Sequence, residues 1–245
     1  MVMTNNQGNY AIQPLTWDSQ FFGFPVGHLR GANVSEIQLR ALIAEAREQG
    51  WRLLYWFVEP SDEASAASAQ TLRIRLTDRK ARFVKKLAAG PQVMSAHVCP
   101  TEELTPRLLE LARQSGHYSR FRLDPAFQAG LYERLYDHWI RRSISGQLAR
   151  QTLIYQPIGE REATGLLTLD YQPTHATIGL LAVQEERRSQ GIGQQLLNAA
   201  LYYAHAWNLP EIHVTTQLDN EGACRFYERQ GFCRVHEEHV YHVWL

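Results

Sequence analysis

Residues 188–193 read Arg188-Ser189-Gln190-Gly191-Ile192-Gly193, and they separate two segments of different periodicity. The segment before them, Ala176 to Val183, is apolar and predicts a strand. The segment after them predicts a helix, with apolar residues at helical spacing: Ile192, Leu196, Ala200, Tyr203 and Trp207. Glycines at a strand-to-helix turn let the backbone approach a ligand and leave N–H groups at the helix start without partners. Because the helix dipole adds positive potential there, we predict a phosphate-bearing cofactor at this turn.

Two other phosphate-binding patterns do not fit this turn. A nucleotide-hydrolysing P-loop has Lys and then Ser or Thr after its last glycine, whereas Gly193 is followed by Gln194 and Gln195. A dinucleotide-binding turn has three glycines and an acidic residue about 20 residues further on. Here the third glycine is missing, and no acidic residue ends the next predicted strand. A glycine-rich turn without a ligand remains an alternative.

A second informative segment follows the predicted helix. Glu211 to Gln217 has apolar or β-branched residues at alternating positions, which predicts a strand. Asn220 is a natural N-cap for the next helix, and Gly231 is placed to end that helix in a left-handed conformation. Asn220 and Tyr227 are about two helical turns apart, so they share a face, with Ala223 between them.

Together the two segments resemble the GNAT N-acetyltransferases. Residues 188–193 match the family's acetyl-CoA loop, which is Gln or Arg, two residues, Gly, one residue, then Gly or Ala. Residues 220–232 match the pattern Asn, two residues, Ala, two residues, Phe-Tyr, three residues, Gly-Phe. The resemblance implies a GNAT fold of the α/β (α+β) class, with a mixed, mostly antiparallel central sheet flanked by helices. It also implies acetyl-CoA as co-substrate.

The resemblance assigns roles to individual residues. The backbone of Leu181, Ala182 and Val183 would bind the pantetheine arm, and the loop Arg188 to Gly193 would hold the pyrophosphate. Asn220 and Ala223 would face the cofactor, with Asn220 also serving as helix cap. Tyr227 matches the general acid that protonates the departing CoA thiolate, and a phenol suits that proton transfer. The alternative for Tyr227 is a core aromatic residue beside Phe226.

Composition is that of a soluble enzyme. The chain has 245 residues and 44% hydrophobic residues, enough for a substantial core. Lys+Arg and Asp+Glu both number 25, and this zero net charge argues against nucleic acid or an anionic membrane as partner. The sequence has no apolar run long enough to span a membrane and no signal-peptide layout, so we expect a cytoplasmic protein.

The cysteines and histidines predict neither disulfides nor a metal. Three cysteines without metal-type spacing fit a reducing cytoplasm. His236, His239 and His242 recur every three residues, but in a segment that predicts a strand, where this period places them on different faces. We therefore expect no bound metal.

The chain is expected to divide near residue 90. Residues 1–90 predict a small αβ domain, with a helix over Ser35 to Gln49, a strand over Trp51 to Glu59 and a loop over Ser61 to Gln70. Residues 91–245 predict one GNAT acetyltransferase domain. Its other elements are a strand (Gln92 to Val98), helices starting at Thr101 and at Phe127, and strands over 149–155 and 163–171. Gly179, in the 176–183 strand, matches a family bulge beside which acetyl-CoA lies.

The front half carries the evidence on the acceptor. Residues 12–23, residues 119–122 and the leading αβ domain resemble the GNAT subfamily that acetylates dTDP-4-amino-4,6-dideoxyhexoses. Arg120 would bind a nucleotide phosphate through two hydrogen bonds. Trp17 would stack on a base or sugar, or alternatively pack as a hydrophobic contact at the domain junction. The expected partner is thus a small-molecule acceptor.

The sequence leaves three questions open. An aminoglycoside, a polyamine, an amino acid or a protein N-terminus is an alternative acceptor for the same fold. A non-catalytic acetyl-CoA-binding module is an alternative to an enzyme. A homodimer is possible through the segment Val240 to Leu245, which we expect to be an edge strand.

Overall fold

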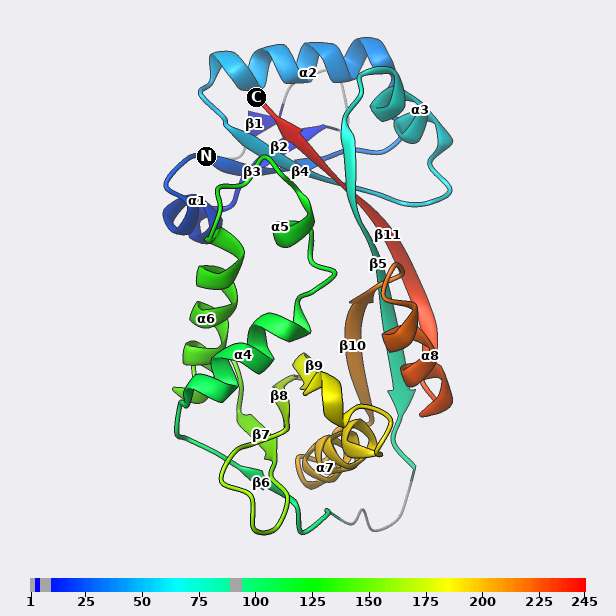
Figure 1. The fold of residues 1–245 in the computed structure, drawn as a ribbon. Helices are drawn as coiled ribbons and strands as arrows, with labels where there is room; N and C mark the ends of the chain where they lie inside the picture. Colours follow the sequence, from blue (N-terminus) through cyan, green and yellow to red (C-terminus); the bar gives the residue numbers. More distant parts are fainter. Residues whose placement is uncertain (1–2, 5–9, 89–93) are drawn as a thin grey trace. The chain divides into compact units, whose positions relative to one another are not determined.

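The computed structural model describes residues 3–4, 10–88 and 94–245, and the chain forms two compact units. The first unit comprises Met1–Lys80 and Glu237–Leu245, and the second comprises Ala81–His236. Two long strands, β5 (Arg75–Lys86) and β11 (Cys233–Trp244), contribute residues to both units (Figure 1). In the described residues, no helix is long and apolar enough to cross a membrane.

The first unit is a small mixed sheet with helices. Its strands run in the order β1-β2-β3-β4-β11-β5. Strand β4 pairs in parallel with β3 and antiparallel with β11, where Phe57 lies opposite Val240. Leu39, Leu54 and Trp56 are fully buried in its core. The other elements of this unit are β1 (Met3–Thr4), β2 (Ala11–Pro14), α1 (Thr16–Phe22), β3 (Val26–Arg30), α2 (Glu36–Glu48), β4 (Leu53–Val58) and α3 (Glu63–Thr71).

The second unit has the strand order β5-β10-β9-β8-β7-β6. Strands β6 to β9 are antiparallel neighbours, whereas β9 and β10 are parallel. The sheet is therefore mixed and mostly antiparallel, as predicted. Its elements are β6 (Val98–Pro100), α4 (Pro106–Ser115), α5 (Arg120–Leu123), α6 (Leu131–Ile144), β7 (Gln151–Tyr155), β8 (Gly165–Gln172), β9 (His175–Val183), the 3-10 helix η1 (Glu185–Arg187), α7 (Ile192–Ala206), β10 (Glu211–Gln217) and α8 (Glu221–Arg229).

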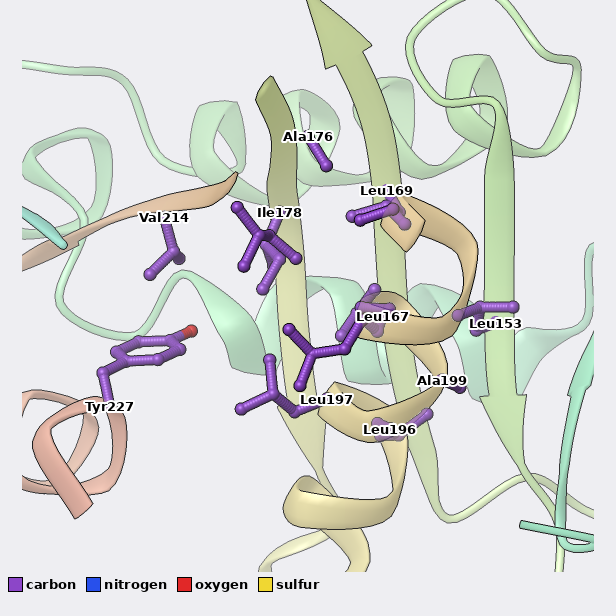
Figure 2. Close-up of a cluster of buried hydrophobic side chains, with 14 of the residues drawn as sticks. Leu153, Leu167, Leu169, Ala176, Ile178, Leu196, Leu197, Ala199, Val214 and Tyr227 are labelled. Atoms are coloured by element: carbon purple, nitrogen blue, oxygen red, sulfur yellow. The ribbon is translucent and has the colours of Figure 1, made fainter. Parts of the chain in front are cut away.

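Helix α7 covers one face of this sheet, and its apolar side forms the main core. Leu196 and Leu197 of α7 are fully buried against Leu167 of β8 and Ile178 of β9, and Tyr227 of α8 joins the same cluster (Figure 2). Helices α4 and α6 pack on each other, and α4 also contacts β8 and β9. Burying such leucine and isoleucine side chains stabilises the fold by about 1.5–3 kcal/mol each.

The structure corrects several expected boundaries. The helix expected from Thr101 begins at Pro106, because Thr105 accepts the N-cap hydrogen bond from Leu108 and proline favours the first helical turn. The helix expected from Phe127 begins at Leu131 after the left-handed Gly130. The strand expected over 92–98 lies partly outside the described residues, and β6 starts only at Val98.

Two expectations about the first unit also differ from the structure. The expected loop over 61–70 is helix α3, capped by Asp62. The expected edge strand over 240–245 is wrong, because β11 lies between β4 and β5. The boundary near residue 90 falls outside the described residues, and the compact units instead change within β5 and again within β11. A strand that continues through a boundary has no linker composition, and for this reason the change of unit within β5 and β11 could not be predicted from sequence.

Candidate functional site

The turn between η1 and α7 presents unpaired backbone donors. None of the N–H groups of residues 190–194 donates a hydrogen bond to another described residue. Helix α7 is capped by Gly191, which has no side chain to satisfy these groups. The side chains of Arg188 and Gln190 fold back onto the carbonyls of Val183 and Glu186, at 3.4 Å each. The result is an exposed, positively polarised helix N-terminus that suits an anion.

The two glycines of this turn lie in different environments. Gly191 has φ +78°, a left-handed conformation that side-chain-bearing residues rarely adopt, and a Cβ atom there would meet nothing within 4 Å. Gly193 lies against α8, where a Cβ atom would come within 3.4 Å of the Phe226 ring. The first glycine therefore shapes the turn, whereas at the second a methyl group would make an ordinary van der Waals contact with α8.

Strand β9, which precedes this turn in the chain, is bulged. Leu167 pairs with Leu181 but Leu169 pairs with Ile178, so β9 has one extra residue between them. The hydroxyl of Thr168 accepts a hydrogen bond from the N–H of Leu180 at 2.8 Å. A Cβ atom on Gly179 would lie 2.8 Å from that oxygen, so the bulge needs glycine.

Beyond the bulge, β9 separates from its parallel neighbour. The β9–β10 ladder covers only Ala176 to Ile178 and Ile212 to Val214. In the described part of the chain, residues 181–183 pair with β8, and residues 179–183 pair with no residue of β10. Leu181, Ala182 and Val183 thus have backbone groups on the β10 side available for an extended ligand.

Helix α8 places the remaining predicted donor-site residues. The Asn220 side chain accepts a hydrogen bond from the N–H of Ala223 at 3.1 Å, so the predicted N-cap is confirmed. Tyr227 is 4% exposed, and its ring lies 5.3 to 5.9 Å from the rings of Phe83, Phe226 and Phe232. Figure 2 shows its hydroxyl end directed toward Ile178. Burial raises the pKa of Tyr227 well above its usual range, so its hydroxyl keeps its proton.

We expect Asn220→Ala to destabilise the protein by about 1 kcal/mol, because the N–H of Ala223 loses its acceptor. Asn220→Ser and Asn220→Asp should recover most of this loss, since both side chains also cap helices well. The measurement is the midpoint of urea unfolding. Equal midpoints for Asn220→Ala and Asn220→Ser would contradict the capping role.

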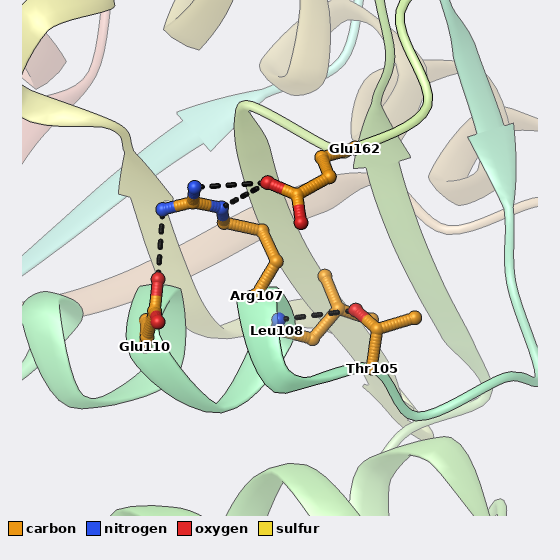
Figure 3. Close-up of polar contacts among 5 residues, drawn as sticks. All are labelled: Thr105, Arg107, Leu108, Glu110 and Glu162. Carbon is orange, nitrogen blue, oxygen red and sulfur yellow. Dashed lines mark hydrogen bonds and ion pairs between the residues drawn. The ribbon is translucent and has the colours of Figure 1, made fainter.

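Ion pairs join the loop between β7 and β8 to helix α4 and to the 3-10 helix η1. Arg107, near the capped start of α4, contacts Glu162 at 2.9 Å and Glu110 at 2.7 Å (Figure 3). Glu160 of the same loop contacts Arg187 of η1 at 2.9 Å. All these groups are partly exposed, so each pair contributes at most about 1 kcal/mol. Their effect is to hold the segment that leads into residues 188–193.

The two residues predicted to bind the acceptor lie in different units. Arg120 begins the short helix α5 of the second unit, is 8% exposed, and has its guanidinium 4.7 Å from the centre of the Phe121 ring. Trp17 lies in α1 of the first unit, half-buried, with its ring stacked 5.1 Å from Phe21. Trp17 as an acceptor contact stays a prediction.

Sequence reasoning missed one group of polar residues, His175, Glu211 and His213, which we call the His–Glu–His cluster. His175 is far from the other two in sequence, and only the pairing of β9 with β10 brings them together. The alternation of Glu211 and His213 on one predicted strand was the available signal.

Comparison with known proteins identifies the fold and the chemistry. The acetyltransferase (GNAT) family matches residues 118–232. The dTDP-fucosamine acetyltransferase of Escherichia coli O6:H1 is 27% identical over 222 residues, covering 90% of this chain and 92% of that protein. N-alpha-acetyltransferase 30 of Schizosaccharomyces pombe is 41% identical over 66 residues, covering 27% of this chain and 44% of that protein. The crystal structure of a GCN5-related N-acetyltransferase from Sphaerobacter thermophilus is similar with a TM-score of 0.62 at 12% identity, covering 96% of this chain and 76% of that one.

Residues 118–232 therefore form a GNAT acetyltransferase domain, and the expected GNAT fold is confirmed. The protein is an acetyl-CoA-dependent N-acetyltransferase, related in sequence to an enzyme named for a dTDP-linked amino sugar.

Proposed function

We propose that this protein transfers the acetyl group of acetyl-CoA to the amine of a nucleotide-linked amino sugar, a dTDP-4-amino-4,6-dideoxyhexose. The observation that carries the proposal is the extent of the likeness to the dTDP-fucosamine acetyltransferase, which runs through nine-tenths of both chains. A likeness restricted to the acetyl-CoA motifs would support the donor alone. This one includes the residues outside the GNAT domain as well.

Two features of the second unit fit acetyl-CoA. The unpaired N–H groups of residues 190–194 are donors for a pyrophosphate at the positive end of α7. The open side of Leu181 to Val183 offers main-chain donors and acceptors to the amides of pantetheine, in the manner of an added strand. Arg188, Ser189, Asn220 and Ala223 complete this proposed donor site.

The catalytic residue in this proposal is Tyr227. When bound, acetyl-CoA supplies an activated thioester carbonyl to the amine. As the new C–N bond forms, the amine nitrogen loses a proton to solvent water, and as the C–S bond breaks, Tyr227 donates its proton to the departing sulfur and later regains one from solvent. Burial raises the pKa of Tyr227, which keeps its hydroxyl protonated in the resting enzyme, and the proton moves only as negative charge develops on the sulfur. A backbone N–H near Val183 polarises the carbonyl oxygen as that oxygen gains charge.

Arg120 is the residue that we propose for the nucleotide part of the acceptor. A guanidinium binds phosphate oxygens through two parallel hydrogen bonds, which a neutral side chain cannot reproduce. The helix cap from Ser119 to Phe121 and the contact with the Phe121 ring hold the backbone and side chain of Arg120 in place. The zero net charge of the chain also disfavours polycationic acceptors.

The test is release of free CoA thiol from acetyl-CoA with a panel of acceptors. We expect turnover with a dTDP-4-amino-4,6-dideoxyhexose, and at least about 100-fold lower kcat/KM for the same amino sugar without its nucleotide, because the phosphate contacts are lost. A UDP-linked amino sugar serves as the matched nucleotide control. Equal rates with and without the nucleotide would contradict the role of the diphosphate.

A peptide with a free N-terminus is the second candidate acceptor. The observation that favours it is the identity of 41% with N-alpha-acetyltransferase 30 over a shorter segment. The panel therefore includes short peptides, and turnover on peptides but on no sugar nucleotide would replace the first proposal by the second.

A further inference from the structure

The His–Glu–His cluster lies at the starts of two parallel strands. Ile212 pairs with Ala176 and His213 pairs with Thr177, so Glu211 is level with His175. Ala176 and Ile212 are buried on the α7 side of the sheet, and alternation places the cluster on the opposite face. Its three ligand-type atoms all lie within 4.8 Å of one another.

The side chains of the cluster contact one another directly. The Nε2 atom of His213 lies 2.7 Å from a carboxylate oxygen of Glu211, and both side chains are mostly buried, with 17% and 28% of their surface exposed. The imidazole rings of His175 and His213 are stacked with their centres 3.8 Å apart. A metal ion would need one ring to rotate, so that both nitrogen lone pairs point to one place.

A further hydrogen bond orients the first histidine. The Thr174 hydroxyl lies 3.0 Å from the Nδ1 atom of His175, which leaves the Nε2 atom of that ring for another partner. Histidine ligands in metal sites commonly have such a hydrogen bond on their second nitrogen. Two imidazole nitrogens and one carboxylate oxygen form a typical protein ligand set for zinc, with a fourth position left for water.

We propose that His175, Glu211 and His213 bind a zinc ion that links the starts of β9 and β10. The site is separate from the proposed acetyl-CoA site, since roughly 13 Å of strand lies between Thr177 and Leu181. The ion would bridge the starts of the two strands, whose other ends diverge, and it would keep a fourth position for water.

The experiment is a calorimetric titration of chelator-treated, tag-free protein with zinc chloride. We expect one ion per chain and a higher Tm when zinc is present. His175→Ala and His213→Ala should each weaken binding by more than about 100-fold, and Thr174→Val by about 10-fold. Arg82, whose positive charge acts on His175, opposes the ion, so Arg82→Gln should tighten binding a few-fold.

His205→Ala is the matched control, because it removes an exposed histidine of α7 outside the cluster. Its zinc affinity should equal that of the wild type. Glu211→Gln covers the case in which an alanine variant fails to fold, since it removes the charge with little change in shape, and it should also weaken binding. The proposal is overturned if the wild type binds no zinc, or if the cluster variants bind zinc as tightly as His205→Ala.

Discussion

Tyr227→Phe is expected to lower kcat by about 100- to 1,000-fold while leaving the KM for acetyl-CoA nearly unchanged, because only the proton donor for the departing thiolate is removed. The ring stays in place among Phe83, Phe226 and Phe232, so the fold should be unaffected. The measurement is steady-state kinetics on the best acceptor of the panel.

Tyr203→Phe is the matched control. It removes a hydroxyl from a partly buried tyrosine of α7, away from the divergence of β9 and β10. Its kcat should equal that of the wild type. If Tyr227→Phe and Tyr203→Phe have the same kcat, Tyr227 is a core aromatic residue and not the general acid.

The pH profile gives a second test of the same assignment. The phenol of an exposed tyrosine loses its proton near pH 10, and burial raises the pKa of Tyr227 above that value. Its proton is therefore present throughout the working range, and ionisation of Tyr227 should cause no fall in the kcat of the wild type below about pH 10. The ratio of wild-type to Tyr227→Phe kcat should accordingly stay constant with pH in that range.

Gly191→Glu is expected to weaken acetyl-CoA binding by at least about 100-fold. A carboxylate roughly 5 Å from the pyrophosphate at an effective dielectric constant of about 20 opposes binding by about 3 kcal/mol. It also neutralises the positive end of α7, where the unpaired N–H groups of residues 190–194 lie. Calorimetric titration with acetyl-CoA measures the change.

The control for backbone strain is Gly146→Glu. Gly146 has φ +74°, close to the +78° of Gly191, and a Cβ atom at either position meets nothing within 4 Å. Both substitutions should lower the Tm to a similar degree, because both force a side chain into a left-handed conformation. Only Gly191→Glu should change the affinity for acetyl-CoA. Equal affinities in the two variants would refute the assignment of the loop.

The elements around the proposed acetyl-CoA site could be predicted from sequence because their signals are local. The strand over 211–217, the Asn220 cap and the left-handed Gly231 each depend on residues close together in the chain, and all three were confirmed. The bulge at Gly179 was expected for the same reason.

The missed features depend on distant contacts. Helix α3 contains serines that disfavour a helix interior, but Ser65 and Ser68 bond the backbone of Val34 at 3.0 and 2.7 Å. These bonds satisfy the hydroxyls in a way that no local pattern reveals. The inner position of β11 and the His–Glu–His cluster likewise arise from pairings between strands far apart in sequence.

The pairing of β4 with β11 also sets an order of events during protein synthesis. Residues 53–58 leave the ribosome early. Their antiparallel partners at 239–244 follow only after all the described helices of the second unit. The nascent first unit therefore exposes an unsatisfied side of β4, with Trp56 beside it, until translation has passed residue 244. The second unit can therefore begin to fold before the first unit is complete.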